Sequence, residues 1–207
     1  VSRMSHELRT PLNAMLGFAQ LLSLDRKPVL TEHQRAWASQ IQQAGWHLLQ
    51  MINDTLDLSR IESGMLKLEP VALELVPLVQ AALAMVEPAA EKRALQIEQR
   101  IDRRARAVRG DETRIKQILT NLLSNAVKYN VDGGRVLIKA RIAESAVVEI
   151  AVSDTGLGMT RSQMDELFQP YNRLGRERSA VEGTGIGLVI SRRLAELMGG
   201  SLRAHSV

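Results

Sequence analysis

The first sixty residues carry apolar side chains at helical spacing and show almost none of the alternation that is typical of strands. The pattern is interrupted at the turn-like sequence of residues 25–28. After this turn, Thr31 and Gln34 have the spacing of a capping box, in which each side chain binds the backbone N–H of the other residue. The pattern therefore predicts two helices that form a hairpin.

One face of the second helix is apolar at positions that recur at alternating steps of four and three, which is the spacing of a coiled-coil seam. They are Trp37, Ile41, Ala44, Leu48, Met51, Thr55 and Leu58. Gly64 is expected to end this helix. Because one hairpin cannot bury such a seam in water, we expect two chains to join as a dimeric four-helix bundle. The alternative is that the hairpin packs only on the rest of its own chain.

From about residue 66 the period changes, and strand-like segments alternate with helical ones. Strands are expected at residues 135–139 and 147–152. The short polar turn between them favours an antiparallel hairpin over a series of βαβ units. Helices are expected near residues 78–92, 112–128, 160–168 and 184–198.

The chain is thus predicted to be an α+β protein, with a helical domain at residues 1–66 and a mixed domain at residues 67–207. Residues 169–183 carry many charges and little apolar periodicity, so a mobile loop is expected there. No apolar run approaches the roughly 20 residues that a membrane-spanning helix needs.

Composition excludes several kinds of chemistry and partner. The absence of cysteine rules out disulfides, zinc–cysteine sites and thiol catalysis. The formal charge of +4 arises in residues 67–207, because basic and acidic residues balance in residues 1–66. Aromatic residues make up 3% of the chain and leave few rings for stacking bases, so no nucleic-acid partner is expected.

His6 differs from an ordinary surface histidine through its neighbours. Thr10 lies one helical turn further on the same face, and Glu7 can accept the proton of one imidazole nitrogen from the side. The other nitrogen then keeps its lone pair, which a histidine nucleophile requires. Pro11 has no N–H to donate to the Glu7 carbonyl, so the helix is expected to bend one turn beyond His6.

A second polar cluster lies on the helix that is expected to begin at Asp111. Asn121, Asn125 and Lys128 share one face of this helix. Amide oxygens can bind a hydrated magnesium ion and an ammonium group can bind phosphate, so this face suits a nucleotide triphosphate. A solvated polar stripe is the alternative. The buried side is expected to contain Ile118, Leu122 and Ala126.

Two glycine-rich segments strengthen the nucleotide hypothesis. Residues 154–159 follow a predicted strand, and residues 183–188 begin a predicted helix. Glycines there let the backbone approach phosphates or a base closely, and a helix start offers N–H donors to anions. A charged loop precedes the second segment where a dinucleotide-binding fold needs a strand, and no Walker-type phosphate loop occurs.

In their order, these motifs closely resemble the transmitter region of sensor histidine kinases of two-component systems. Residues 1–63 resemble the dimerisation and histidine phosphotransfer domain. The chain from residue 67 resembles the catalytic ATP-binding domain, an α/β sandwich also found in DNA gyrase and heat-shock chaperone ATPases. The matching motifs are the H box at 5–12, the N box at 121–129, the glycine boxes at 154–158 and 183–187, and the F box at 167–171.

The resemblance implies a binding site for ATP and Mg²⁺ in the second domain. Asp154 accepts a hydrogen bond from the adenine amino group, and Asn125 holds the metal. Asn121 and Lys128 contact the triphosphate, and residues 169–182 close as a lid. The other residues expected to border the nucleotide or to anchor the lid are Tyr129, Gly156, Gly158, Phe168, Gly183, Thr184, Gly185, Gly187 and Leu188.

The resemblance also implies the reaction and the partners. His6 attacks the γ-phosphate of ATP with Glu7 as its orienting base, and the phosphoryl group then passes to an aspartate of a response regulator receiver domain. Thr10 supports removal of phosphate from the regulator. The chain is expected to be a homodimer in the cytoplasm. Any sensor domain or membrane segment is expected upstream, and the closing strand of the family is expected beyond Val207.

Two alternatives stay open from the sequence. ATPases of the same fold place a glutamate, the base that activates water, four residues before the metal-binding asparagine, and that position is Asn121 here. An amide cannot take the proton, which disfavours simple hydrolysis. The other alternative is a degenerate kinase that acts only as a dimeric scaffold, which is disfavoured because every motif residue is intact.

Overall fold

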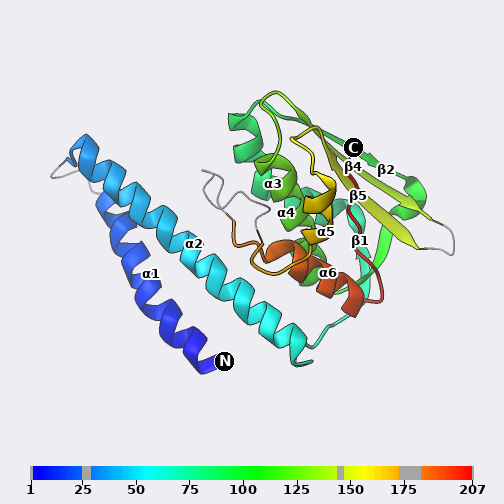
Figure 1. Cartoon of the computed structure of the whole chain (residues 1–207), viewed down its shortest axis with the longest axis horizontal. Coiled ribbons are helices and arrows are strands. Elements are labelled where there is room, and N and C mark those ends of the chain that lie inside the picture. Colours follow the sequence, from blue (N-terminus) through cyan, green and yellow to red (C-terminus); the bar gives the residue numbers. More distant parts are fainter. Residues whose placement is uncertain (1, 25–28, 144–146, 173–182, 207) are drawn as a thin grey trace.

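The computed structural model of the chain describes residues 2–24, 29–143, 147–172 and 183–206, with the backbone alone over residues 2–7. Its first part is a pair of long helices, α1 (Ser2–Leu24) and α2 (Glu32–Glu62), which lie side by side as the predicted hairpin (Figure 1). The turn expected at residues 25–28 lies outside the described residues.

Both expected ends of α2 are confirmed. Thr31 Oγ1 accepts from Gln34 N at 3.3 Å and Gln34 Oε1 accepts from Thr31 N at 2.9 Å, which completes the capping box. At the other end Gly64 has a φ of +67°, and Met65 N donates back to the Arg60 carbonyl at 3.0 Å. This closing turn needs a left-handed residue, which glycine supplies without a steric penalty from a Cβ.

The hairpin is held together by apolar packing within one chain. Leu12, Leu16 and Ala19 are buried on α1, and Ala38 is buried on α2. The helices approach closely at Gly45, because a Cβ at that position would overlap the Leu16 side chain.

The predicted seam on α2 is largely exposed in the single chain. Trp37 is 61% exposed, and Ile41 and Leu48 are also exposed. Leu58 differs, because it is buried against a helix from the second part of the chain. The assignment of Leu58 to the seam is therefore wrong, and the uncovered apolar face ends before it.

The described residues of the second part of the chain form two small sheets. β1 (Val71–Glu74) pairs antiparallel with β3 (Ala107–Gly110). In the other sheet, β4 (Arg135–Ile142) lies between β2 (Gln96–Ile101) and β5 (Val148–Asp154). β4 and β5 form the expected antiparallel hairpin, whereas β2 pairs with β4 in parallel. The parallel pair has no local signal in the sequence, because a long crossover through β3 and a helix connects its strands.

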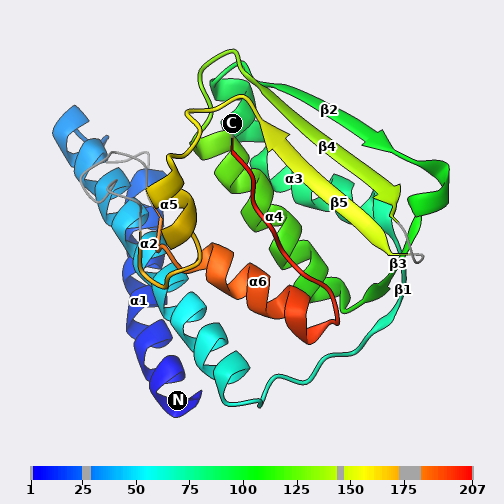
Figure 2. The same ribbon diagram turned by 45° about the vertical axis from the view of Figure 1, so that its right-hand side comes forward.

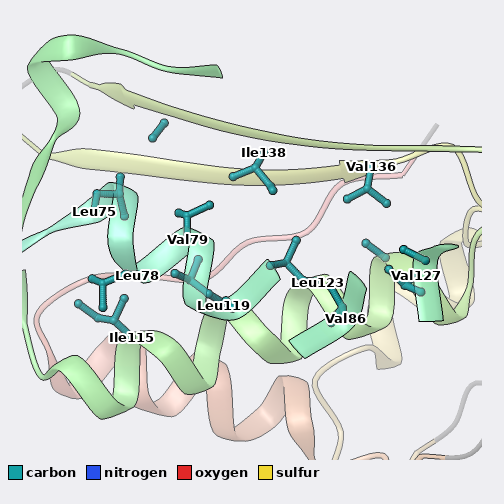
Figure 3. Packing of buried hydrophobic residues seen from close by; sticks show 14 of the residues in the cluster. Leu75, Leu78, Val79, Val86, Ile115, Leu119, Leu123, Val127, Val136 and Ile138 are labelled. Atoms are coloured by element: carbon teal, nitrogen blue, oxygen red, sulfur yellow. The ribbon is translucent and has the colours of Figure 1, made fainter. Parts of the chain in front are cut away.

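Helices cover one face of the three-stranded sheet. Figure 2 shows α3 and α4 against this face, with α6 between α4 and α2. Val136 and Ile138 point from β4 toward Val79 of α3 and Leu123 of α4 (Figure 3). The predicted α+β class is thus confirmed. The helices of this part are α3 (Leu75–Lys92), the short 3₁₀ helix η1 (Arg103–Ala105), α4 (Glu112–Lys128), α5 (Arg161–Glu166) and α6 (Gly187–Leu197).

The buried face of α4 differs from the predicted one in two positions. Leu122 is only half-buried, and Ile118 packs toward α2 and α6 instead of the main core. The helix has neighbours on two sides, which a single helical pattern does not distinguish. Its buried residues are Ile115, Leu119, Leu123, Ala126 and Val127.

Within the part of the chain that the structure describes, no helix is both long and apolar enough to cross a membrane.

Candidate functional site

The helix that carries the predicted polar face, α4, is capped at its start by Asp111, whose side chain is held by two hydrogen bonds. Asp111 Oδ1 accepts from Arg114 N and Asp111 Oδ2 accepts from Glu69 N, both at 3.1 Å. The bond from Glu69 N, together with that from Arg114, holds the pKa of the Asp111 carboxyl below its ordinary value. The linker that follows α2 is therefore tied to the start of α4.

The three polar residues of this face have different surroundings. Asn121 and Asn125 are half-buried, whereas Lys128 is exposed in the last turn. Asn121 Nδ2 donates to Oγ of the buried Ser191 on α6 at 2.9 Å. A Cβ on Gly187 would overlap the Asn121 side chain, so this glycine lets α6 begin directly beside α4. Asn121 thus joins the two helices.

The first glycine segment is attached to the end of α4. β5 ends at Asp154, whose Oδ1 accepts from Gly156 N at 2.8 Å. Leu157 N donates to the Tyr129 carbonyl at 3.2 Å, and a Cβ on Gly156 would overlap that carbonyl. Gly158 has a φ of +63°, a conformation that favours glycine. The structure therefore brings Asp154 and Tyr129 together.

The Tyr129 side chain also reaches the second glycine segment. A Cβ built on Gly183 would lie 3.8 Å from the Tyr129 hydroxyl oxygen. Gly185 has a φ of +71°, and its carbonyl accepts from Tyr171 N at 3.2 Å. Leu188 is half-buried in the first turn of α6. Both glycine segments, far apart in sequence, thus meet at the C-terminal end of α4.

Phe168, which follows α5, contacts α6. The guanidinium carbon of Arg192 lies 4.8 Å from the centre of the Phe168 ring, a cation–π arrangement. The half-buried ring is thereby held beside the helix that the second glycine segment begins. Most of the expected lid, residues 173–182, lies outside the described residues.

Asp54 of α2 contacts the second glycine segment, although it is absent from the residues expected at the site. Thr184 Oγ1 donates to Asp54 Oδ2 and Gln50 Nε2 donates to Asp54 Oδ1, both at 2.7 Å. The carboxyl is deeply buried, with Asp54 only 6% exposed. The helical hairpin therefore reaches a residue that is expected to border the nucleotide.

This contact belongs to an interface between α2 and the second part of the chain. On α4, Arg114 Nη1 and Gln117 Nε2 donate to Asp57 Oδ2 at 3.3 and 3.0 Å. Polar groups thus flank an apolar centre, an arrangement that specific interfaces share. The apolar centre consists of Leu58, Ile61, Ile186, Val189, Ile190 and Leu194.

A sequence signal for this interface exists in α2. Asp54, Leu58 and Ile61 follow one another at steps of four and three, so a carboxyl shares the helical face of two buried apolar residues. A carboxyl on such a face needs a hydrogen-bonding partner. The identity of the partner could not be read from the sequence, because Thr184 lies 130 positions further on.

Burial raises the pKa of the Asp54 carboxyl above its ordinary value, since the bonds from Thr184 and Gln50 only partly offset the desolvation of the charged form. Between the ordinary and the raised pKa, the folded state binds more protons than the unfolded state. The free energy of unfolding therefore falls as pH rises through this window. We expect Asp54→Asn to flatten this part of the profile, measured by urea unfolding from about pH 4 upward.

The matched control is Asp165→Asn, which changes an exposed carboxyl on α5 and should keep the slope of the unchanged chain. An Asp54→Asn profile as steep as that of the unchanged chain would contradict the expectation.

The remaining candidates lie on α1. His6 and Glu7 are in its first turns, with side chains outside the described residues, and Thr10 is exposed one turn beyond His6. Next to Thr10, Arg9 donates two hydrogen bonds to Asn53 Oδ1 of α2, at 3.0 and 2.6 Å. Because Asn53 precedes Asp54, α2 contacts this turn of α1 and the second glycine segment through adjacent residues.

Two protein families match the chain. Residues 1–64 match the family described as "His Kinase A (phospho-acceptor) domain". Residues 110–207 match the family described as "Histidine kinase-, DNA gyrase B-, and HSP90-like ATPase". The second match covers α4, both glycine segments and α6, which are the elements that contact one another along α4 between Asn121 and Tyr129.

Similar proteins carry the same pair of regions within longer chains. The chain is 39% identical to Sensor protein GacS of Pseudomonas syringae pv. syringae, over 100% of its own length and 23% of that protein. It is 35% identical to Histidine protein kinase DivJ of Caulobacter vibrioides, over 100% of its own length and 34% of DivJ. It therefore spans only part of these relatives.

A solved structure supports the fold over nearly the whole chain. Full-length ShkA in complex with AMPPNP superposes with a TM-score of 0.77 at 30% identity. The superposition covers 99% of this chain and 43% of ShkA. The arrangement of a helical hairpin followed by a mixed α+β part is therefore shared with a solved protein.

Proposed function

Because this chain belongs to the sensor histidine kinases, as a transmitter region, we propose that it transfers the γ-phosphoryl group of ATP to His6 and then to an aspartate of a response regulator. One observation carries the proposal. The first glycine segment contacts the Tyr129 carbonyl, the second lies beside the Tyr129 hydroxyl, and the start of α6 lies beside Asn121 of α4, in a chain whose first helix bears His6.

In this proposal the nucleotide is bound beside the C-terminal half of α4, between Asn121 and Tyr129. The Asp154 carboxylate accepts from Gly156 N and has further lone pairs for the adenine amino group. Lys128 binds the triphosphate as a point charge. An amide nitrogen carries two donors, so Asn121 can bind Ser191 and a phosphate oxygen together.

The second glycine segment supplies backbone donors to the phosphates. Gly185 and Gly187 flank the start of α6, whose first N–H groups favour an anion. Gly183, Thr184 and Leu188 border the same region, and Phe168 fixes the segment that precedes the lid. A side chain on Gly187 would push Asn121 out of place. The phosphates would then lose access to the backbone N–H groups at the start of α6.

The donors of the site fit Mg²⁺ bound together with ATP. The described residues contain no group of three or more His, Cys, Asp or Glu side chains that could hold a metal ion. Mg²⁺ needs no such group where one protein oxygen, substrate phosphates and water complete its shell. We propose Asn125 as the protein ligand. When bound, the ion neutralises charge on the phosphates.

The reaction requires a nucleophile and an orienting base. One ring nitrogen of His6 attacks the γ-phosphorus, the N–P bond forms as the bond to the β,γ-bridging oxygen breaks, and ADP leaves. Glu7 holds the proton of the other ring nitrogen and so keeps the attacking lone pair available. The remaining residues contribute positioning.

A homodimer is proposed from the apolar surface of the hairpin. Phe18, Leu21 and Leu22 of α1 are exposed, as are Trp37 and Ile41 of α2. Large apolar side chains exposed on both helices of a hairpin indicate an interaction surface, and a second copy covers it in a four-helix bundle. Since ATP and receiver domains are found inside the cell, the region is proposed to act in the cytoplasm.

Simple ATP hydrolysis is a weaker proposal for this site. The residue four positions before Asn125 is Asn121, an amide that donates to Ser191 and cannot take a proton from water. A hydrolase would need a residue other than Asn121 as the base that takes the proton from water.

The proposed reaction is tested by incubating the chain with Mg²⁺ and ATP labelled at the γ-phosphate. The expected result is a protein-bound label that is lost in acid and survives base, because a phosphoramidate bond hydrolyses in acid. A label that survives acid would place the phosphate on a hydroxyl or would indicate another reaction. Failure to label at all would contradict the proposal.

Thr10→Ala is expected to separate two activities. Thr10 lies on the helical face of His6 but one turn away, where a hydroxyl can hold a water near a phosphorylated receiver domain. Labelling of His6 should stay within about threefold of the unchanged chain, while dephosphorylation of the regulator should fall by about tenfold or more. Both rates are measured with the same regulator preparation.

Glu7→Ala is the comparison variant and should reduce labelling of His6 first. Equal loss of both activities in Thr10→Ala, or no loss of either, would show that Thr10 merely bonds to its own helix.

A further inference from the structure

The turn that follows α4 contains a buried amide. Asn130 is 3% exposed. Its Oδ1 accepts from Val131 N at 2.9 Å and from Thr155 Oγ1 at 3.2 Å, and its Nδ2 donates to the Arg135 carbonyl at 3.0 Å. A buried amide whose oxygen and nitrogen are both hydrogen-bonded is held in one orientation. Asn130 is therefore a rigid anchor for the Thr155 hydroxyl.

Thr155 directly follows Asp154, the residue proposed to bind adenine. Its Oγ1 accepts from Arg135 N at 2.9 Å while donating to Asn130, and its backbone N donates to the Arg135 carbonyl at 3.1 Å. A Cβ on Gly134 would overlap both the Asn130 and the Thr155 side chains. Thr155 is exposed as a residue, but its hydroxyl is bonded on both sides, between the end of β5 and the start of β4.

The backbone around Asn130 is also held by the side chain of Arg93. Arg93, which follows α3, donates to the carbonyls of Val127 and Asn130, each at 2.6 Å, and to that of Lys128 at 3.0 Å. It also pairs with Asp132 at 2.8 Å. These bonds satisfy carbonyls at the C-terminal end of α4, where a cation is favoured. The backbone around Asn130 therefore has little freedom to move.

We propose that Asn130 and Thr155 are positioning residues that set the orientation of the Asp154 carboxylate, and thereby the preference of the site for adenine over guanine nucleotides. This inference rests on the proposed function, in which Asp154 accepts from the adenine amino group. Adenine carries a donor at the position where guanine carries an acceptor oxygen. A fixed carboxylate gains a hydrogen bond from adenine and repels guanine, whereas a mobile carboxylate turns away from the guanine oxygen.

The test compares two variants that differ in one hydroxyl. Thr155→Val replaces the hydroxyl by a methyl group of similar size, and Thr155→Ser keeps the hydroxyl. The Kd values of Mg·ATP and Mg·GTP are measured by calorimetry on the whole chain. Thr155→Val should weaken ATP binding about tenfold and change GTP binding less than about twofold, so that the preference falls about tenfold. Thr155→Ser should keep the preference of the unchanged chain.

Thr155→Ala is the second variant, because it removes the hydroxyl without adding a methyl group, and it should reproduce the loss. An equal decrease for ATP and GTP in Thr155→Ala would indicate a merely structural role and would overturn the inference. The inference would also be overturned if Thr155→Ala kept the wild-type preference for ATP over GTP. It would be overturned as well if the wild-type chain did not prefer ATP.

Failure of the inference and failure of the proposed function are distinguished by the unchanged chain. If that chain binds Mg·ATP and forms an acid-labile label, the proposed function stands whatever the Thr155 variants do. If it does neither, the proposed function fails first.

Discussion

His6→Gln is expected to abolish the acid-labile label, with a decrease of more than about 100-fold, because the amide of glutamine has no nucleophilic nitrogen lone pair. Glutamine is close to histidine in size and polarity, so the start of α1 should be preserved. Binding of Mg·ATP should stay within about twofold of the unchanged chain, since the segments that meet around Tyr129 lie in the other part of the molecule. The label and the Kd are measured on the same preparation.

The matched controls replace histidines that have no proposed role. His33 is exposed on α2 and contacts the Trp37 ring, and His205 is exposed near the C-terminal end. His33→Gln and His205→Gln should both keep the label. If His6→Gln keeps the label while either control loses it, the phosphorylated residue is not His6, and the assignment from the H box fails.

Asn125→Asp is expected to have the second large effect. The amide is half-buried on α4, one turn after Asn121 and about one turn before Lys128. A carboxylate here places a negative charge toward the triphosphate and replaces a neutral metal ligand by a charged one, and both changes disturb the charge balance between the metal and the phosphates. Labelling of His6 should fall by more than about 100-fold.

The effect of Asn125→Asp should be confined to the nucleotide site. Sedimentation should show the same oligomeric state as the unchanged chain, because the exposed apolar residues of the hairpin are distant in sequence and belong to other helices. Gln99→Glu is the matched control, since it makes the same amide-to-carboxylate change at an exposed position of β2. Retained labelling in Asn125→Asp would contradict the assignment of Asn125 to metal and phosphate.

Local features of this chain were predictable because they depend on residues only a few positions apart. The capping box of Thr31 and Gln34, the helix start at Asp111 and the left-handed turn at Gly64 are each formed within one helical turn. The β4–β5 hairpin is likewise a connection between neighbouring strands. The glycine segments could be found as well, because the sequence shows directly where a Cβ is absent.

Features that depend on packing were predicted less well. Leu58 has the spacing of the exposed seam, yet it is buried against α6 of its own chain. Ile118 has the spacing of a core residue of α4, yet it packs toward α2 and α6. In both cases helical spacing identifies an apolar face but does not say which neighbour covers it.

The sequence by itself thus determined the long helices, the β4–β5 hairpin, the capped starts of α2 and α4 and the order of the motifs that identify the family, whereas β1, β2 and β3 were not predicted. The tertiary structure alone decided that β2 lies parallel to β4, that Asp54 accepts a hydrogen bond from the Thr184 hydroxyl, and that Asn130 accepts one from the Thr155 hydroxyl. The physical reason is the range of the interactions. A cap or a turn is stabilised by bonds within its own segment, whereas these contacts form only after the burial of many apolar side chains has brought distant segments together.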